Sequence, residues 1–129
     1  MTGFVVPQWP RQQPGPRLNE VPCQTKIVAH ARRFGWLAHA ERASTNRSGK
    51  HSTAIQGDVG FPDLVLIHPP TRRLLVVEVK RRPNNVEPDQ LRWLEAFHLC
   101  GIDTTVWWVP EQLHEVYGLL ADPYQRGVA

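Results

Sequence analysis

The chain has 129 residues, a formal charge of +3 and an isoelectric point near 9.2. A chain of this length suits one domain with a modest core, which excludes a second catalytic unit. Two cysteines, Cys23 and Cys100, are too few for a disulfide scaffold, so we expect buried thiols in a reducing compartment. No apolar run approaches the roughly 18 residues that span a bilayer and no apolar signal segment is visible, so we expect a cytoplasmic protein without a membrane partner.

The N-terminal part predicts an arm followed by a helix. Residues 1–17 are rich in proline, glutamine and glycine, and should form an extended arm that packs on the domain or reaches a second subunit. A helix should begin after Asn19, a favourable N-cap, and run to about Phe34 before Gly35 stops it. Glu20 lies in the first turn, where an acid complements the helix dipole whether or not it has a further role.

A strand and a long polar stretch come next. Residues 36–40 predict a short strand, and the chain then turns polar and rich in glycine, serine and threonine from residue 41 to residue 59. Loops of this length in compact domains are usually functional or disordered, and the stretch holds the basic residues Arg47 and Lys50.

Two short apolar runs predict a β-hairpin. Residues 64–67 and 74–77 are rich in leucine, valine and isoleucine, and residues 68–73 between them read as a loop with two prolines. The two runs should therefore pair antiparallel. If the loop is centred between Pro70 and Thr71, positions equidistant from that point face each other.

This register places three charged residues together. Asp63 falls opposite Glu78, with Cβ atoms roughly 4.5 to 5.5 Å apart, and Lys80 projects from the same face two residues further along. Charges among apolar strand residues are costly to bury unless a metal or a partner compensates them. One cation could bridge both carboxylates, whereas the alternative is a solvent-facing strip in which Glu78 and Lys80 form a weak surface pair.

A helix should follow the second hairpin strand. Arg81 and Arg82 carry two guanidinium groups away from the edge of the proposed site. Pro88 then opens a helix that ends at Gly101, with apolar residues at helical spacing. Gln90 lies in the first turn of this helix, which should return it close to Lys80.

The C-terminal part predicts one more strand and one more helix. Residues 104–109 should form a strand parallel to the one that holds Glu78, because a helix connects the two. Trp107 and Trp108 then point to opposite faces, one into the core and the other under a helix or against a base. Residues 111–120 predict a final helix, and 122–129 form a tail without clear features.

The string Gly60-Phe61-Pro62-Asp63, followed by Glu78-Val79-Lys80, Gln90 and Trp93, resembles the VRR-NUC family of the PD-(D/E)XK nuclease superfamily. Upstream, Glu20, Gln24, Gly35-Trp36 and residues 55–58 fit the same pattern, so the resemblance covers roughly residues 18 to 120. It implies an α/β restriction-endonuclease-like core of the order αβββαβ, with a central mixed sheet flanked by helices. The nuclease domain would then span residues 18–121, between the arm and the tail.

The resemblance also implies a chemistry. Asp63, Glu78 and the backbone carbonyl of Val79 would hold Mg²⁺ or Mn²⁺, and Lys80 would orient or deprotonate the water that attacks a phosphodiester. Gln90 would hold a phosphate oxygen or that water. Glu20 would support the site from the first helix, by orienting metal-bound water or by holding a second metal.

The substrate follows from the resemblance alone. Small stand-alone members of the family, many of them encoded by phages, look like dimeric endonucleases that resolve four-way (Holliday) junctions in DNA. The implied partners are thus branched DNA and a second copy of the chain in a bacterial or phage-infected cell. A flap, nicking or restriction-type DNase and a non-catalytic DNA-binding module remain as alternatives. The expected phosphate contacts are Arg47, Lys50, Arg81 and Arg82.

Overall fold

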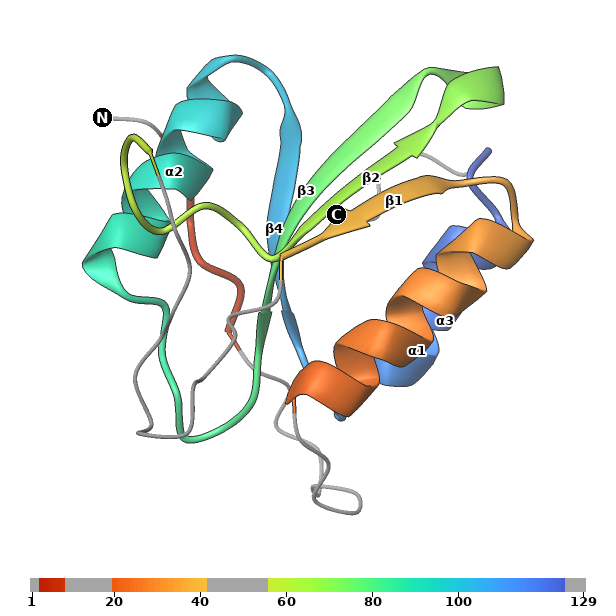
Figure 1. Ribbon diagram of the computed structural model, residues 1–129, viewed down its shortest axis with the longest axis horizontal. Coiled ribbons are helices and arrows are strands. Elements are labelled where there is room, and N and C mark those ends of the chain that lie inside the picture. The colour runs from red at the N-terminus through yellow and green to blue at the C-terminus, as the bar shows by residue number, and fades with distance from the viewer. Residues whose placement is uncertain (1–2, 9–19, 42–55, 125–129) are drawn as a thin grey trace.

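The computed structural model describes residues 3–8, 20–41 and 56–124 and shows a sheet with helices on both faces (Figure 1). The side chains of residues 20–22 lie outside this description, as do the polar stretch 42–55 and most of the tail. The elements in chain order are α1 (Glu20–Arg33), β1 (Leu37–Ala40), β2 (Leu64–His68), the 3₁₀ turn Pro69–Thr71, β3 (Arg73–Lys80), α2 (Pro88–Leu99), β4 (Asp103–Trp108) and α3 (Leu113–Ala121).

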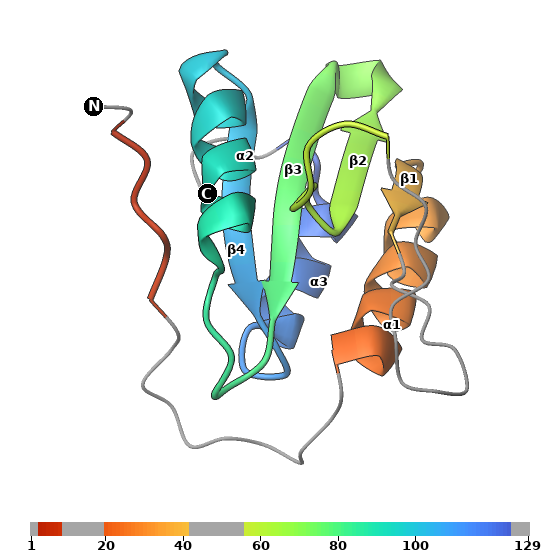
Figure 2. The same cartoon turned by 60° about the vertical axis from the view of Figure 1, so that its left-hand side comes forward.

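The four strands form one mixed sheet in the order β1-β2-β3-β4. β2 runs antiparallel to both β1 and β3, and β4 runs parallel to β3 because α2 carries the chain back along the sheet. Figure 2 shows α2 on one side of the sheet and α1 with α3 on the other. The predicted αβββαβ order, the parallel last strand and the final helix are all confirmed.

The hairpin has the predicted register. Leu64 pairs with Val77 and His68 with Arg73, so the turn is centred between Pro70 and Thr71. A one-residue shift would have sent every side chain of β2 to the other face of the sheet. The register therefore places the residue before Leu64 across from Glu78.

Each face of the sheet has its own hydrophobic core. The larger core lies under α1 and α3 and receives Leu64, Val77 and Trp107. The smaller core lies under α2, where Trp108 meets Leu94 of that helix. The two tryptophans thus occupy opposite faces, as their alternation predicts. Consequently, side chains of β3 that alternate with Val77 point toward α2.

The ends of α1 and the cysteines follow local chemistry. Gly35 adopts a φ of 89° just after the helix, a conformation that glycine reaches without strain, so the predicted stop is confirmed. Both cysteines are free thiols, but only Cys23 is buried. The expected burial of Cys100 is wrong because it lies in the exposed turn after α2. None of the helices in the described part of the chain is long and apolar enough to cross a membrane.

The described part of the arm packs on the domain. Residues 3–8 run along the side of α2 and β4 (Figure 2). Phe4 contacts the smaller core and the ring of His98, with ring centroids 5.6 Å apart. The indole N–H of Trp108 donates to the carbonyl oxygen of Pro7 at 2.6 Å. These contacts support the first of the two roles that the sequence leaves open for the arm.

We expect Phe4→Ala to lower the free energy of unfolding by about 1 to 2 kcal/mol, because it removes a half-buried ring from the smaller core. Val5→Ala is the matched control, since Val5 is 79% exposed and its truncation should change stability by less than about 0.5 kcal/mol. Urea denaturation of both variants measures the difference. Equal stability of the two variants would show that the arm does not contribute to the core.

Candidate active site

Asp63 is held at the beginning of β2 by three backbone contacts. One oxygen of its carboxylate, Oδ2, accepts a hydrogen bond from the backbone N–H of Val79 at 2.9 Å. Its own N–H donates to Oε1 of Glu78 at 3.2 Å, and its carbonyl oxygen accepts from the N–H of Glu41 at 2.9 Å. The predicted juxtaposition of Asp63 and Glu78 is therefore present, although Asp63 directly precedes the strand.

Glu78 is fully buried in the middle of the sheet. Its Oε2 atom has no hydrogen-bond partner among the described residues, which is costly for a buried polar atom. The pKa of Glu78 is raised from 4.5 to about 9. Burial is the largest cause, and a side-chain hydrogen bond with Asp63 and the charge of Asp63 also raise the pKa, while the Lys80 ammonium and the backbone N–H of Asp63 lower it. Glu78 is thus largely protonated at neutral pH unless a cation compensates its charge.

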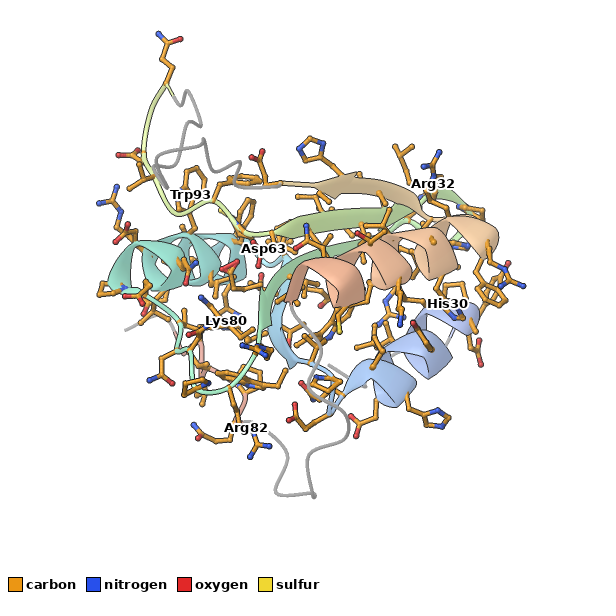
Figure 3. The ribbon with its side chains drawn as sticks, turned by 60° about the horizontal axis from the view of Figure 1, so that its bottom comes forward. His30, Arg32, Asp63, Lys80, Arg82 and Trp93 are labelled. Atoms are coloured by element: carbon orange, nitrogen blue, oxygen red, sulfur yellow. The ribbon has the colours of Figure 1, made fainter. Side chains whose placement is uncertain are left out.

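Lys80 completes the group on the same face of β3. It is 8% exposed, and its positive charge lowers the pKa of Glu78, which places the ammonium within electrostatic reach of the carboxyl pair. Figure 3 shows Asp63 and Lys80 close to the end of β3, beside α2, with Arg82 beyond the end of the strand. No described residue forms an ion pair with Lys80.

The segment that leads to Asp63 rests on α2. Gly60 adopts a φ of 96°, and a Cβ atom there would lie 2.6 Å from the carbonyl carbon of Asp89. Only glycine permits this approach. The indole N–H of Trp93 donates to the carbonyl oxygen of Val59 at 3.0 Å, and Arg92 pairs with Asp58 at 3.0 Å. The first turns of α2 thereby fix the entry of the chain into the site.

Gln90 has a capping role that sequence reasoning missed. Its Oε1 accepts a hydrogen bond from the backbone N–H of Glu87 at 2.9 Å, and the Glu87 side chain accepts one from the N–H of Gln90. This reciprocal pair is a capping box at the start of α2. The pattern Glu87-Pro88-Asp89-Gln90 signals it only weakly, because serine or threonine usually occupies the first position. The helix turn of Gln90 lies against Gly60, but its contact with a phosphate or water stays a prediction.

The beginning of α1 is tied to the site through Glu41. The side-chain amide of Gln24 donates to the carbonyl oxygen of Glu41 at 3.1 Å, and the N–H of Glu41 donates to Asp63. Glu20 is the first residue of α1, one turn before Gln24, and its side chain lies outside the described residues. Its supporting role therefore stays a prediction.

Of the four predicted phosphate contacts, two can be located. Arg81 and Arg82 directly follow Lys80, whereas Arg47 and Lys50 fall in the stretch outside the described residues. The Nη2 atom of Arg82 lies 3.1 Å from Oε1 of Glu111, whose side chain is 4% exposed. The other oxygen of Glu111 is buried and has no hydrogen-bond partner among the described residues. No signal in the sequence identifies this buried acid, which follows a strand-ending proline.

We expect Arg82→Ala to lower the free energy of unfolding by about 2 kcal/mol, because it leaves the buried Glu111 carboxylate without its ion-pair partner. Arg82 is 29% exposed, so solvent screens part of the interaction. Glu111→Gln in the same background should recover most of the loss. Thermal unfolding of the single and double variants measures it, and an equally unstable double variant would contradict the expectation.

The donor set suits a hard divalent cation. Two carboxylates would supply oxygen ligands, together with the carbonyl of Val79, whose N–H contacts Asp63, and Oε2 of Glu78 is a buried acceptor without a partner among the described residues. Among the residues that the structure describes, no cluster of three His, Cys, Asp or Glu side chains forms. A set of few protein ligands matches Mg²⁺, which usually keeps several waters.

Comparisons with known proteins identify the arrangement. The family model described as the VRR-NUC domain matches residues 11–110. A solved structure described as a VRR_NUC domain is 25% identical in sequence, with a TM-score of 0.54, and the match covers 77% of this chain and 94% of that one. No curated protein matches the chain. Since the matched region contains the opposed carboxylates, Lys80 and the helix that supports them, the chain belongs to the VRR-NUC family, a nuclease family of the PD-(D/E)XK type.

Proposed function

We propose that the chain is a divalent-metal-dependent endodeoxyribonuclease that cuts branched DNA, and in particular four-way junctions, as a homodimer. The observation that carries the catalytic part is the pair of opposed carboxylates, Asp63 and Glu78, with a buried unpaired oxygen on Glu78. A cation is the partner that such an oxygen needs, and Lys80 stands beside it as a positive group for phosphate.

Asp63, Glu78 and the carbonyl oxygen of Val79 would hold Mg²⁺ or Mn²⁺. When bound, the metal increases the acidity of water and neutralises charge on the phosphate. The chain itself fixes the ligands in advance: the Val79 N–H orients the Asp63 carboxylate, and the strand pairing fixes the position of Glu78. This preorganisation lowers the cost of assembling the site.

Lys80 acts on the reacting atoms. Its ammonium donates hydrogen bonds to the attacking water and to a non-bridging phosphate oxygen. The water oxygen forms a bond to phosphorus and gives up one proton to solvent, the bond from phosphorus to O3′ breaks, and O3′ takes up a proton from solvent. The products carry a 5′-phosphate and a 3′-hydroxyl. Gln90 and Glu20 assist from α2 and α1, by holding a phosphate oxygen and by orienting water.

The preference for junctions rests on symmetry and on the family. A four-way junction requires two incisions on strands related by a twofold axis, and one chain provides one site. An isologous dimer supplies two sites with matching symmetry. Arg47, Lys50, Arg81 and Arg82 would contact phosphates without reading bases.

A panel of end-labelled DNAs tests the proposal. Purified protein is incubated with four-way junction, flap, nicked, single-stranded and linear duplex DNA, each with Mg²⁺, with Mn²⁺ and with chelator, and its mass is measured by light scattering. We expect metal-dependent, paired and symmetric cuts in the junction by a protein of dimer mass. Preferential cutting of flaps or nicks would assign the same chemistry to another substrate. If the protein binds DNA but cuts none of these substrates, it is a DNA-binding module and the proposed nuclease activity is contradicted.

A further inference from the structure

We propose that an open pocket beside the carboxylates receives an unstacked nucleobase from the DNA strand that is cut. The pocket has a volume of about 620 Å³, within the roughly 300 to 1,000 Å³ typical of small-ligand sites. Its described lining consists of His39, Glu41, Gln56, Gly57, Asp58, Phe61, Val65 and Trp93. This inference rests on the proposed function, because it names what lies next to the scissile phosphate.

The pocket lies beside the candidate active site. Phe61 lies two residues before Asp63, and Val65 lies two residues after it in β2, and both line the pocket. Glu41, at the rim, donates its backbone N–H to Asp63. A nucleotide whose phosphate lies at Asp63 therefore has its neighbouring base within reach of the pocket.

The pocket exists because α2 covers only part of its face of the sheet. Among the described elements, α2 packs on β3 and β4 and makes no extensive contact with β1 or β2, whose residues His39 and Val65 pair with each other. The segment from Gln56 to Phe61 instead forms one wall. Figure 3 places Trp93 on the α2 side of this wall, near Asp63.

One wall of the pocket is aromatic. The rings of Phe61 and Trp93 meet edge to face, with centroids 5.0 Å apart at 75°, and Phe61 is 37% exposed. The hydrogen bond from Trp93 to Val59 and the contact between Phe61 and Phe97 hold both rings in place. Fixed, partly exposed aromatic faces are the surfaces on which bases stack in single-strand-binding proteins.

The polar rim favours a base over a phosphate. Glu41 and Asp58 are carboxylates, each with one oxygen in contact with a neighbour, His39 at 3.3 Å and Arg92 at 3.0 Å, and no lysine or arginine is among the described residues that line the pocket. Carboxylates repel phosphate but accept hydrogen bonds from the amino groups of adenine, cytosine and guanine, which thymine lacks. Nucleotides at a branch point are less costly to unstack than those inside a duplex, since the continuous stacking of base pairs is interrupted there.

The test uses four-way junctions in which one nucleotide at a time, across the branch and the cut site, is replaced by an abasic residue. Affinity is measured by fluorescence anisotropy with the full chain in Ca²⁺, and cleavage in Mn²⁺. At one position next to the cut, the abasic residue should weaken binding by wild-type protein roughly five- to hundredfold. Phe61→Leu, which keeps apolar bulk against Trp93, should weaken binding to intact junction similarly and lose no further affinity at the abasic position.

Two further variants sharpen the result. Leu99→Ala is the matched control, because Leu99 is an exposed apolar residue of α2 outside the pocket, and it should retain the wild-type response to the abasic position. Glu41→Gln changes an exposed side chain and should reduce the preference for cytosine over thymine at that position. This preference compares two DNAs with one protein, so it does not depend on the stability of the variant.

The outcomes separate this inference from the proposed function. Suppose that the protein cuts junctions, but that the losses of affinity caused by the abasic residue and by Phe61→Leu are additive at every position. The pocket then does not hold a base. If no DNA is cut but the two effects still coincide in Ca²⁺, the pocket holds a base and the nuclease proposal fails. Absence of DNA binding would overturn both.

Discussion

Glu78→Gln is expected to reduce the single-turnover rate of metal-dependent DNA cleavage by at least about a thousandfold. The amide keeps the size of the side chain but cannot supply the second negative charge that the cation requires, and a bound metal contributes several kcal/mol to stabilisation of the transition state. The rate is measured on a labelled four-way junction with Mn²⁺. A variant that cuts within tenfold of the wild-type rate would exclude Glu78 as a metal ligand.

The same substitution should stabilise the metal-free protein. The pKa of Glu78 is about 9 in the folded protein and near 4.5 as a model group, so between these values the folded state binds more protons than the unfolded state. Stability therefore falls as pH rises from about 4.5 to about 9, by about 3 kcal/mol at pH 7. Glutamine does not titrate, so the variant should lack this loss and unfold several degrees higher at pH 7 in chelator.

Thermal unfolding from pH 5 to pH 9 measures this effect, with and without Mn²⁺. The metal should raise the midpoint of the wild-type protein and leave that of Glu78→Gln unchanged, because a ligand stabilises only the state that binds it. If the unfolding midpoints of the two metal-free proteins change with pH in the same way, the pKa of Glu78 does not differ between the folded and unfolded states.

Lys80→Met is expected to reduce cleavage about 10²- to 10⁴-fold while DNA affinity changes little. Methionine fills the same space at a position that is only 8% exposed, but it removes the donor that orients water and contacts the phosphate. Single-turnover cleavage and anisotropy in Ca²⁺ separate the two effects. A proportional loss of binding and cleavage would assign Lys80 to DNA binding alone.

Two neighbouring changes serve as comparisons. Lys80→Arg should not restore cleavage, since a planar guanidinium differs from an ammonium in shape and hydrogen-bond geometry. Arg81→Ala should instead weaken binding to DNA of any sequence. It should also lower the slope of log affinity against log salt concentration by about one in magnitude. The cleavage rate at saturating Arg81→Ala protein should stay near that of the wild type.

The part of the site that lies within one hairpin could be predicted from the sequence. Alternation with a period of two, the two prolines of the turn and the apolar runs fixed the register that opposes Asp63 and Glu78. Alternation also sent Trp107 and Trp108 to different cores. These predictions succeeded because each depends on residues within one hairpin or one strand.

Features that join distant parts of the chain could not be predicted. The ion pair of Arg82 with Glu111 depends on how the loop after β3 meets the loop after β4. The pocket beside Asp63 depends on how far α2 extends over the sheet, and the exposure of Cys100 depends on the turn after that helix. The cap that Gln90 forms with Glu87 is a local contact, but it is hard to predict because serine or threonine usually occupies the first position of a capping box.

Calorimetric titration of Mn²⁺ into metal-free protein tests most directly whether Asp63 and Glu78 form a cation site. Wild-type protein and Lys80→Met should bind Mn²⁺ with similar affinity, since Lys80 is not a ligand, and Glu78→Gln and Asp63→Asn should each lose most of that binding. Unchanged Mn²⁺ affinity in both carboxylate variants would contradict the assignment of the two opposed carboxylates as the metal site.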